Sequence, residues 1–125
     1  MSKKPTTSPK FSSPAEVSEA VLEAFKKASA ITGQAQPDGQ GRVTLKPTRF
    51  SNGAITGSPE QVETARKSRV LFTALRLLGY PFVQACELAY EIEQDKSIMS
   101  HDDLRAQVAM KIILAHCLRL CYYFL

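Results

Sequence analysis

Six basic side chains between positions 42 and 69 are the strongest candidates for chemistry in this chain of 125 residues. Residues 1–69 hold eleven Lys or Arg against six Asp or Glu, whereas residues 70–125 hold five against six. Such a basic half favours an anionic partner, and nucleic acid is the one whose phosphates Lys and Arg neutralise. The candidate nucleic-acid contacts are Arg42, Lys46, Arg49, Arg66, Lys67 and Arg69, with Lys3, Lys4 and Lys10 of the N-terminal tail in addition.

The same cations have a second interpretation, in which they serve only the fold. Arg69 and Arg76 would then pair with acids of the following helix, and the other charges would form a solvated face. The acids in question are Glu87 and Glu91. Phe50 stands among the basic residues, where it would either stack on a base or anchor a hairpin to the core.

Three cysteines and two histidines are the residues that could ligate a metal or act as nucleophiles. Cys117 and Cys121 stand four apart, but His116 points about 100° away from Cys117 on a helix, and no C-x2-C spacing is present. Cysteine in an apolar helix, here including Cys86, is usually a small core residue. With no Gly-rich phosphate loop after a strand and no carboxylate pair on a polar face, we expect no metal, no cofactor and no catalytic residue.

The chain ends on large apolar side chains, which is unusual because most domains end in polar residues. This ending either packs into the core of the same chain or forms an interface with a partner or a second copy. The candidate interface residues are Leu118, Tyr122, Tyr123, Phe124 and Leu125. Two functions therefore stay open: a small non-catalytic accessory or regulatory protein that binds nucleic acid, or a protein-interaction module (adaptor, inhibitor or assembly subunit) docking through its last helix, with homodimerisation possible.

The element that must position these residues is a central helix over 58–79. Ser58, Pro59 and Gln61 predict its start with a capping box, and Gly79 predicts its end. Apolar residues cover most of its circumference, which is typical of a core helix, and leave one polar stripe through Arg66, Arg69, Thr73 and Arg76. The apolar residues are Val70, Leu71, Phe72, Ala74, Leu75, Leu77 and Leu78.

Three further helices are predicted, over 13–31, 81–95 and from 100 towards the end of the chain. The helices 58–79 and 81–95 resemble a helix-turn-helix in layout, but 77–95 contains no Lys or Arg and four acids. We therefore expect an αα-hairpin of the core and no DNA-reading helix. The helix over 81–95 is expected to bury a broad apolar face: Phe82, Val83, Ala85, Cys86, Ala89, Tyr90 and Ile92.

The segment 34–57 is the one long irregular part. A short strand over 42–46 and a hairpin pairing 48–50 with 54–56 around Ser51-Asn52-Gly53 are predicted there, with Pro47 limiting any strand to an edge. The fold class is thus mainly α, a small four-helix domain with a short β-hairpin or irregular loop between the first two helices. Residues 1–12 are expected to form a disordered basic tail, and 13–125 a single helical domain.

The cellular setting is predicted from what the chain lacks. Its start has positive charge without an apolar run after it, so we expect no signal peptide. The most apolar stretch, 108–125, is interrupted by Lys111, His116 and Arg119, and it is shorter than the ~20 residues that a membrane span needs. An odd number of cysteines favours reduced thiols. These features predict a soluble, cytoplasmic protein with no membrane contact.

Overall fold

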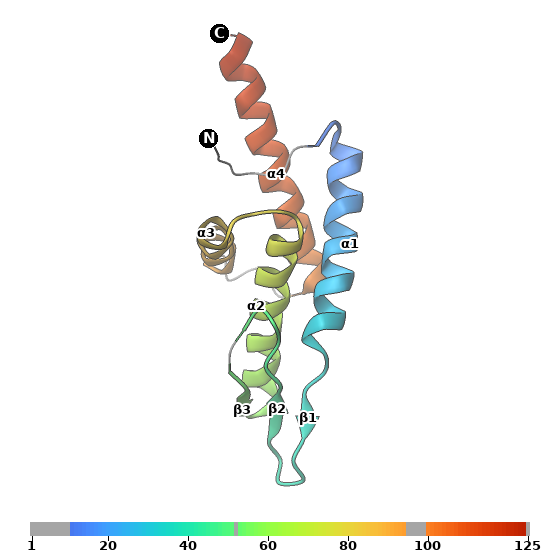
Figure 1. The fold of residues 1–125 in the computed structure, drawn as a ribbon, viewed down its shortest axis with the longest axis vertical. Coiled ribbons are helices and arrows are strands. Elements are labelled where there is room, and N and C mark those ends of the chain that lie inside the picture. The colour runs from blue at the N-terminus through green and yellow to red at the C-terminus, as the bar shows by residue number, and fades with distance from the viewer. Residues whose placement is uncertain (1–10, 52, 95–99, 125) are drawn as a thin grey trace.

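A computed structural model describes the backbone of residues 11–51, 53–94 and 100–124, with side chains described up to residue 115. Within these ranges the chain forms four helices and a three-stranded antiparallel sheet placed between the first two helices, so the mainly α fold is confirmed. Figure 1 shows an elongated molecule with the sheet at one end and the C-terminal part of the last helix at the other. The basic tail expected over 1–12 falls mostly outside the described residues.

The first helix, α1 (Pro14–Thr32), starts and ends where its sequence signals predict. The Ser13 hydroxyl accepts a hydrogen bond from the Glu16 amide at 3.2 Å. The Glu16 carboxylate accepts hydrogen bonds from the amide and the hydroxyl of Ser12, the residue before the N-cap. Gly33 ends the helix with φ of 76°, a region that L-residues avoid. The apolar stripe is buried: Val17, Val21, Ala24, Phe25 and Ala28.

The second helix, α2 (Pro59–Leu77), is the centre of the fold, as predicted. Its capping box is complete, because Ser58 and Gln61 exchange side chain-to-amide hydrogen bonds, each of 3.2 Å. It contacts α1, α3 and the strands β2 and β3, and Figure 1 shows it between these elements. Its side chains with no exposed surface are Val62, Val70, Leu71, Ala74 and Leu75. The predicted polar stripe is partly wrong, because Arg66 and Thr73 are buried.

The sheet differs from the predicted hairpin. It consists of β1 (Gln36–Pro37), β2 (Val43–Leu45) and β3 (Ile55–Gly57), in the order β1-β2-β3. Leu45 pairs with Ile55 and Val43 with Gly57, so 55–57 pairs with 43–45 and not with 48–50. This register buries Leu45 completely against the helices, whereas Pro47 cannot continue a ladder. The predicted turn at 51–53 lies inside a longer loop, closed by a bridge between Thr48 and Ser51.

The third helix, α3 (Phe82–Glu93), packs on α2 through a narrower face than predicted. Only Ala85, Ala89 and Ile92 are buried, whereas Cys86 is exposed. Phe82, Val83 and Tyr90 are 61%, 63% and 68% exposed. The side of α3 that faces the core therefore carries two small alanines and one isoleucine, and the larger side chains lie outside it. The αα-hairpin itself is confirmed, with Phe72 and Phe82 in edge-to-face contact at 5.7 Å between ring centroids.

The last helix, α4 (His101–Phe124), is capped by the Ser100 hydroxyl, which accepts from the Asp103 amide at 3.1 Å. Leu104, Val108 and Ile112 are buried in the common core. Figure 1 shows the C-terminal part of α4 running past the ends of the other helices. The predicted interface residues from 118 onwards lie outside the part whose side chains are described. Among the described residues, no helix has the length and apolarity to cross a membrane.

Candidate nucleic-acid interface

The loop over residues 46–54, called the 46–54 loop below, is fastened to α2 by one arginine. The Arg69 guanidinium donates to the Lys46 carbonyl at 2.9 Å and also to the Gly53 carbonyl. One planar group therefore bridges the two ends of the loop, a geometry that the fork of arginine donors allows and a lysine ammonium does not reproduce. Arg69 closes the loop and fixes its position on the helix.

The described residues of the 46–54 loop include two exposed cations and one aromatic ring. Lys46 and Arg49 are exposed, and the Arg49 guanidinium carbon lies 4.8 Å from the centroid of the Phe50 ring. At the tip, Thr48 and Ser51 exchange backbone hydrogen bonds of 3.2 Å, and the Phe50 amide donates to the Thr48 hydroxyl at 3.1 Å. These bonds connect Thr48, Phe50 and Ser51, next to the exposed Arg49.

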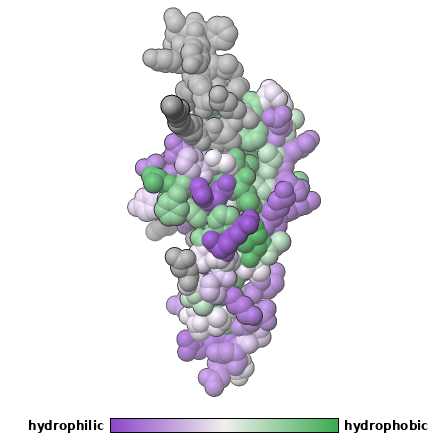
Figure 2. Space-filling view, viewed as in Figure 1, coloured by the Kyte–Doolittle hydropathy of each residue, from purple (hydrophilic) through white to green (hydrophobic). Residues whose placement is uncertain are grey.

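Arg42 extends the same basic surface along the sheet. It precedes β2, and the Asp38 carboxylate accepts from its amide at 3.3 Å in the turn that joins β1 to β2. Side chains alternate between the faces of a strand, so Arg42, Thr44 and Lys46 share the face opposite the buried Leu45. On that face the Thr44 and Thr56 hydroxyls are hydrogen-bonded at 2.9 Å. On the face drawn in Figure 2, many of the side chains at this end of the molecule are hydrophilic.

The other predicted contacts do not join this exposed group. Arg66 is buried, its Nε donates to the Gly33 carbonyl at 2.8 Å, and it lies 3.8 Å from Glu63, so it ties α2 to the end of α1. Lys67 is half-buried and lines a pocket between α2, α3 and α4 that is described below. The exposed basic surface therefore comprises Arg42, Lys46 and Arg49, with Arg69 as its support.

The predicted pairing of Arg69 and Arg76 with the acids of α3 is wrong. Arg69 binds the loop, while Arg76 donates to the Tyr80 carbonyl at 2.9 Å and so secures the turn before α3. Glu91 contacts Lys111 of α4. Arg69 and Arg76 of α2 therefore both donate to backbone carbonyls of neighbouring loops instead of to the carboxylates of α3.

An apolar groove that the sequence did not predict lies beside the basic surface. It runs between the 46–54 loop, α2 and α3, and has a volume of about 330 Å³. Phe50, Phe72 and Tyr90 supply an aromatic ring from each of these three elements, and Glu93 lies at the α3 side. The sequence does not indicate this groove, because Phe72 and Tyr90 have the spacing of core residues in their helices. Figure 2 shows hydrophobic side chains at the surface at the level of α3.

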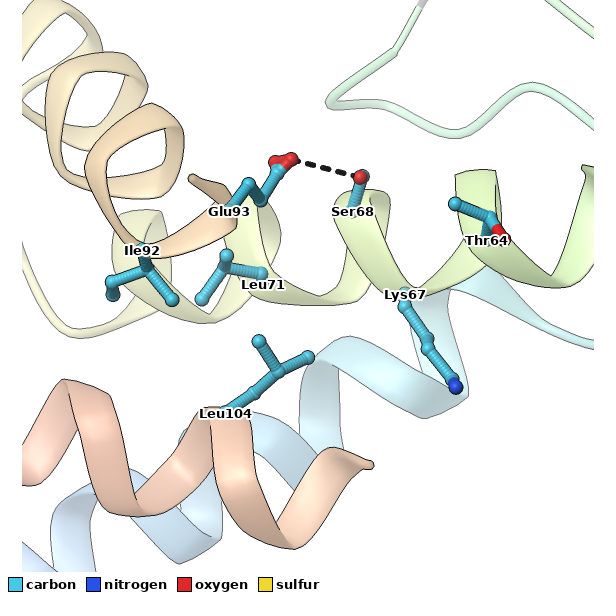
Figure 3. Close-up of a pocket in the computed structure, with 7 residues that line it drawn as sticks. All are labelled: Thr64, Lys67, Ser68, Leu71, Ile92, Glu93 and Leu104. Atoms are coloured by element: carbon cyan, nitrogen blue, oxygen red, sulfur yellow. Dashed lines mark hydrogen bonds between the residues drawn. The ribbon is translucent and has the colours of Figure 1, made fainter. Parts of the chain in front are cut away.

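A second pocket of about 350 Å³ lies at the junction of α2, α3 and α4. Figure 3 shows Leu71, Ile92 and Leu104 converging there from the three helices, with a hydrogen bond of 2.9 Å from the Ser68 hydroxyl to Glu93 beside them. Its floor is apolar and its one described carboxylate is engaged by Ser68. We assign it no chemistry.

Among the described residues, no group of three or more His, Cys, Asp or Glu side chains is placed to hold a metal ion. Cys86 was expected in the core but is exposed on α3 and lines the apolar groove. The side chains of His116, Cys117 and Cys121 lie outside the described part.

His101, the first residue of α4, sits in a cationic environment. Burial is the largest cause that lowers its pKa below the usual 6.5, and the positive charges of Arg66, Lys67 and Arg105 act in the same direction, against Glu63. Its Nε2 is buried and has no hydrogen-bond partner among the described residues. The folded protein therefore favours the neutral imidazole.

We expect His101 to make the protein less stable in mild acid. Because its folded pKa is below the unfolded value of 6.5, its full contribution is present above pH 6.5 and is lost as the pH falls towards the folded pKa. Urea unfolding of the wild type and of His101→Gln, at pH values well above and well below 6.5, measures this effect. The wild type should lose more unfolding free energy than the variant on acidification, and equal losses would contradict the assignment.

The Arg69 bridge gives a second expected result. Arg69→Lys keeps the charge but not the bridge, so the unfolding free energy should fall by about 1 kcal/mol. The amides of Thr48 and Ser51 should exchange hydrogen faster. Arg42→Lys, at an exposed arginine next to the same sheet, is the matched control and should change neither quantity. Exchange in the 46–54 loop that is unaffected by Arg69→Lys would show that the bridge does not order the loop.

A scan of protein-family models, a search of curated proteins and a search of solved structures each returned no match to this chain.

Proposed function

We propose that this protein is a small non-catalytic nucleic-acid-binding protein, with an accessory or regulatory role, whose contact surface is formed by Arg42, Lys46 and Arg49. The observation that carries the proposal is the bridge from Arg69 to the Lys46 and Gly53 carbonyls. The half-buried Arg69 fastens the loop that carries Lys46 and Arg49, and a merely solvated charged face does not require such a fastening.

The physical basis is the release of counterions from phosphates. When the salt concentration rises, the logarithm of the affinity falls. For each phosphate that Lys or Arg neutralises, this fall is about 0.9 per log unit of salt for duplex DNA and about 0.7 for single strands. A loop that is ordered before binding loses less conformational entropy in the complex, so more of the electrostatic gain remains. Three contacts of this kind give weak binding that depends strongly on salt.

Fluorescence anisotropy with labelled duplex and single-stranded oligonucleotides at several low salt concentrations tests this function. Binding should be present at low ionic strength and should weaken by about 2 to 3 log units per log unit of salt, as expected for three phosphate contacts. The absence of salt-dependent binding to every strand would overturn the proposal.

A second candidate function is a protein-interaction module that docks through α4, with a second copy of this chain as the partner. Met110 and Leu114 on α4 are 51% and 53% exposed, and the helix continues past the rest of the fold. Apolar side chains that reach solvent on an extended helix are typical of an interface. Light scattering tests this candidate, because the chain alone has a mass of 13.8 kDa and a dimer twice that value, and a monomer would contradict docking on a second copy.

A further inference from the structure

We propose that the groove between the 46–54 loop, α2 and α3 receives unpaired bases, so that the ligand is single-stranded nucleic acid. This inference rests on the proposed function and adds the class of nucleic acid and a second contact surface. Two independent features support it, the aromatic lining of the groove and the opposite charge of its two sides.

The aromatic lining suits flat, uncharged rings. Tyr90 is 68% exposed, whereas Phe50 and Phe72 are half-buried, and all three line the same groove of about 330 Å³. The Arg49 guanidinium already lies over the Phe50 ring, so a cation and aromatic rings lie together. Proteins bind single strands by combining such stacking surfaces with a cationic track for the backbone.

The distribution of charge selects a single strand over a duplex. On the loop side stand Lys46, Arg49 and Arg69, while α3 contributes acids and, over its whole described length, no cation. A duplex lying across both sides would bring phosphates towards Glu87 and Glu93, which repel them. A single strand has phosphates along one edge and bases along the other. It therefore places phosphates at the loop and bases towards α3.

Glu93 adds a way to distinguish one base from another. Its carboxylate accepts one hydrogen bond from Ser68 at 2.9 Å and retains further acceptor positions. Carboxylates accept hydrogen bonds from exocyclic amino groups such as N4 of cytosine. Strands of cytosine or adenine should therefore bind more tightly than strands of thymine, which lacks an amino group.

The test compares labelled oligo-dC, oligo-dA and oligo-dT of equal length with a duplex, by anisotropy at one low salt concentration. Single strands should bind more tightly than the duplex. Tyr90→Ala should weaken single-strand binding by roughly 5- to 100-fold and leave duplex binding unchanged, because one stacking contact is lost. Tyr90→Phe should retain most of the affinity. Glu93→Gln should reduce the preference for oligo-dC over oligo-dT.

Val83→Ala is the matched control, since Val83 is 63% exposed on the same helix and is not among the described residues that line the groove. It should bind like the wild type. Cys86 lines the groove and reports its occupancy without any substitution. Saturating oligo-dC should slow the modification of Cys86 by a maleimide, measured by mass spectrometry on the peptide that contains it.

The outcomes separate the two proposals. If Tyr90→Ala binds oligo-dC like the wild type and Cys86 is not protected, while substitution of the basic loop residues abolishes binding, the base site is wrong and the proposed function stands. If single strands and duplex bind equally, the selection by charge is wrong. If no strand binds but an acidic aromatic peptide protects Cys86, both proposals are overturned and the groove is a peptide site.

Discussion

Replacing Leu75 with alanine should lower the free energy of unfolding by about 2–5 kcal/mol. Leu75 has no exposed surface and lies on the side of α2 that faces the common core of the four helices. Truncation removes its buried methyl groups and leaves a cavity that the packed helices fill only in part. Urea unfolding followed by circular dichroism measures the loss.

Leu22→Ala is the matched control for this substitution. Leu22 is 42% exposed on α1, so the same truncation there should cost much less, about 0.5 kcal/mol. An unfolding midpoint that Leu75→Ala leaves unchanged would remove α2 from the centre of the fold. A loss at Leu22 as large as that at Leu75 would show that the leucine content of the helices, and not the position, sets their stability.

The helices were largely predictable because their start and end signals are local. Ser13 and Ser58 each accept a hydrogen bond from an amide three residues later, and Gly33 and Gly79 both have positive φ at the helix ends. Backbone groups at helix termini need partners near in sequence, so a short stretch of sequence is sufficient to place them.

The strand register and the exposed side of α3 were not predictable in the same way. Leu45 pairs with Ile55 because that pairing buries Leu45, which depends on where the helices lie. Apolar periodicity gave α3 a broad buried face, but the fold buries Ala85 and Ala89 and leaves Tyr90 in solvent. Contacts between elements decided both outcomes.

The sequence names the basic residues of the candidate site but does not indicate which of them bind backbone carbonyls. Arg42, Lys46 and Arg49 are exposed, as a contact with phosphate requires, while Arg66 and Arg69 bind backbone carbonyls between 16 and 33 residues away. No local spacing indicates such partners, because the tertiary fold brings the carbonyls to the helix. The same holds for the groove, whose rings come from three separate elements.

Changing Arg42, Lys46 and Arg49 together to alanine should weaken nucleic-acid binding evenly across sequences and leave stability nearly intact. The three side chains are exposed, and exposed charges contribute little to folding. A double variant of Lys26 and Lys27, two exposed lysines of α1, removes positive charge elsewhere and should bind almost like the wild type. Glu87→Gln should not weaken binding, because it removes a charge that repels phosphate.

The slope of log affinity against log salt, compared between the wild type and the triple alanine variant, is the most direct test of nucleic-acid binding by this surface. Three lost phosphate contacts should flatten the slope by about 2 to 3, with unchanged thermal stability showing that the variant is folded. A triple variant that binds with the same affinity and the same slope as the wild type would contradict the assignment of this surface to phosphate.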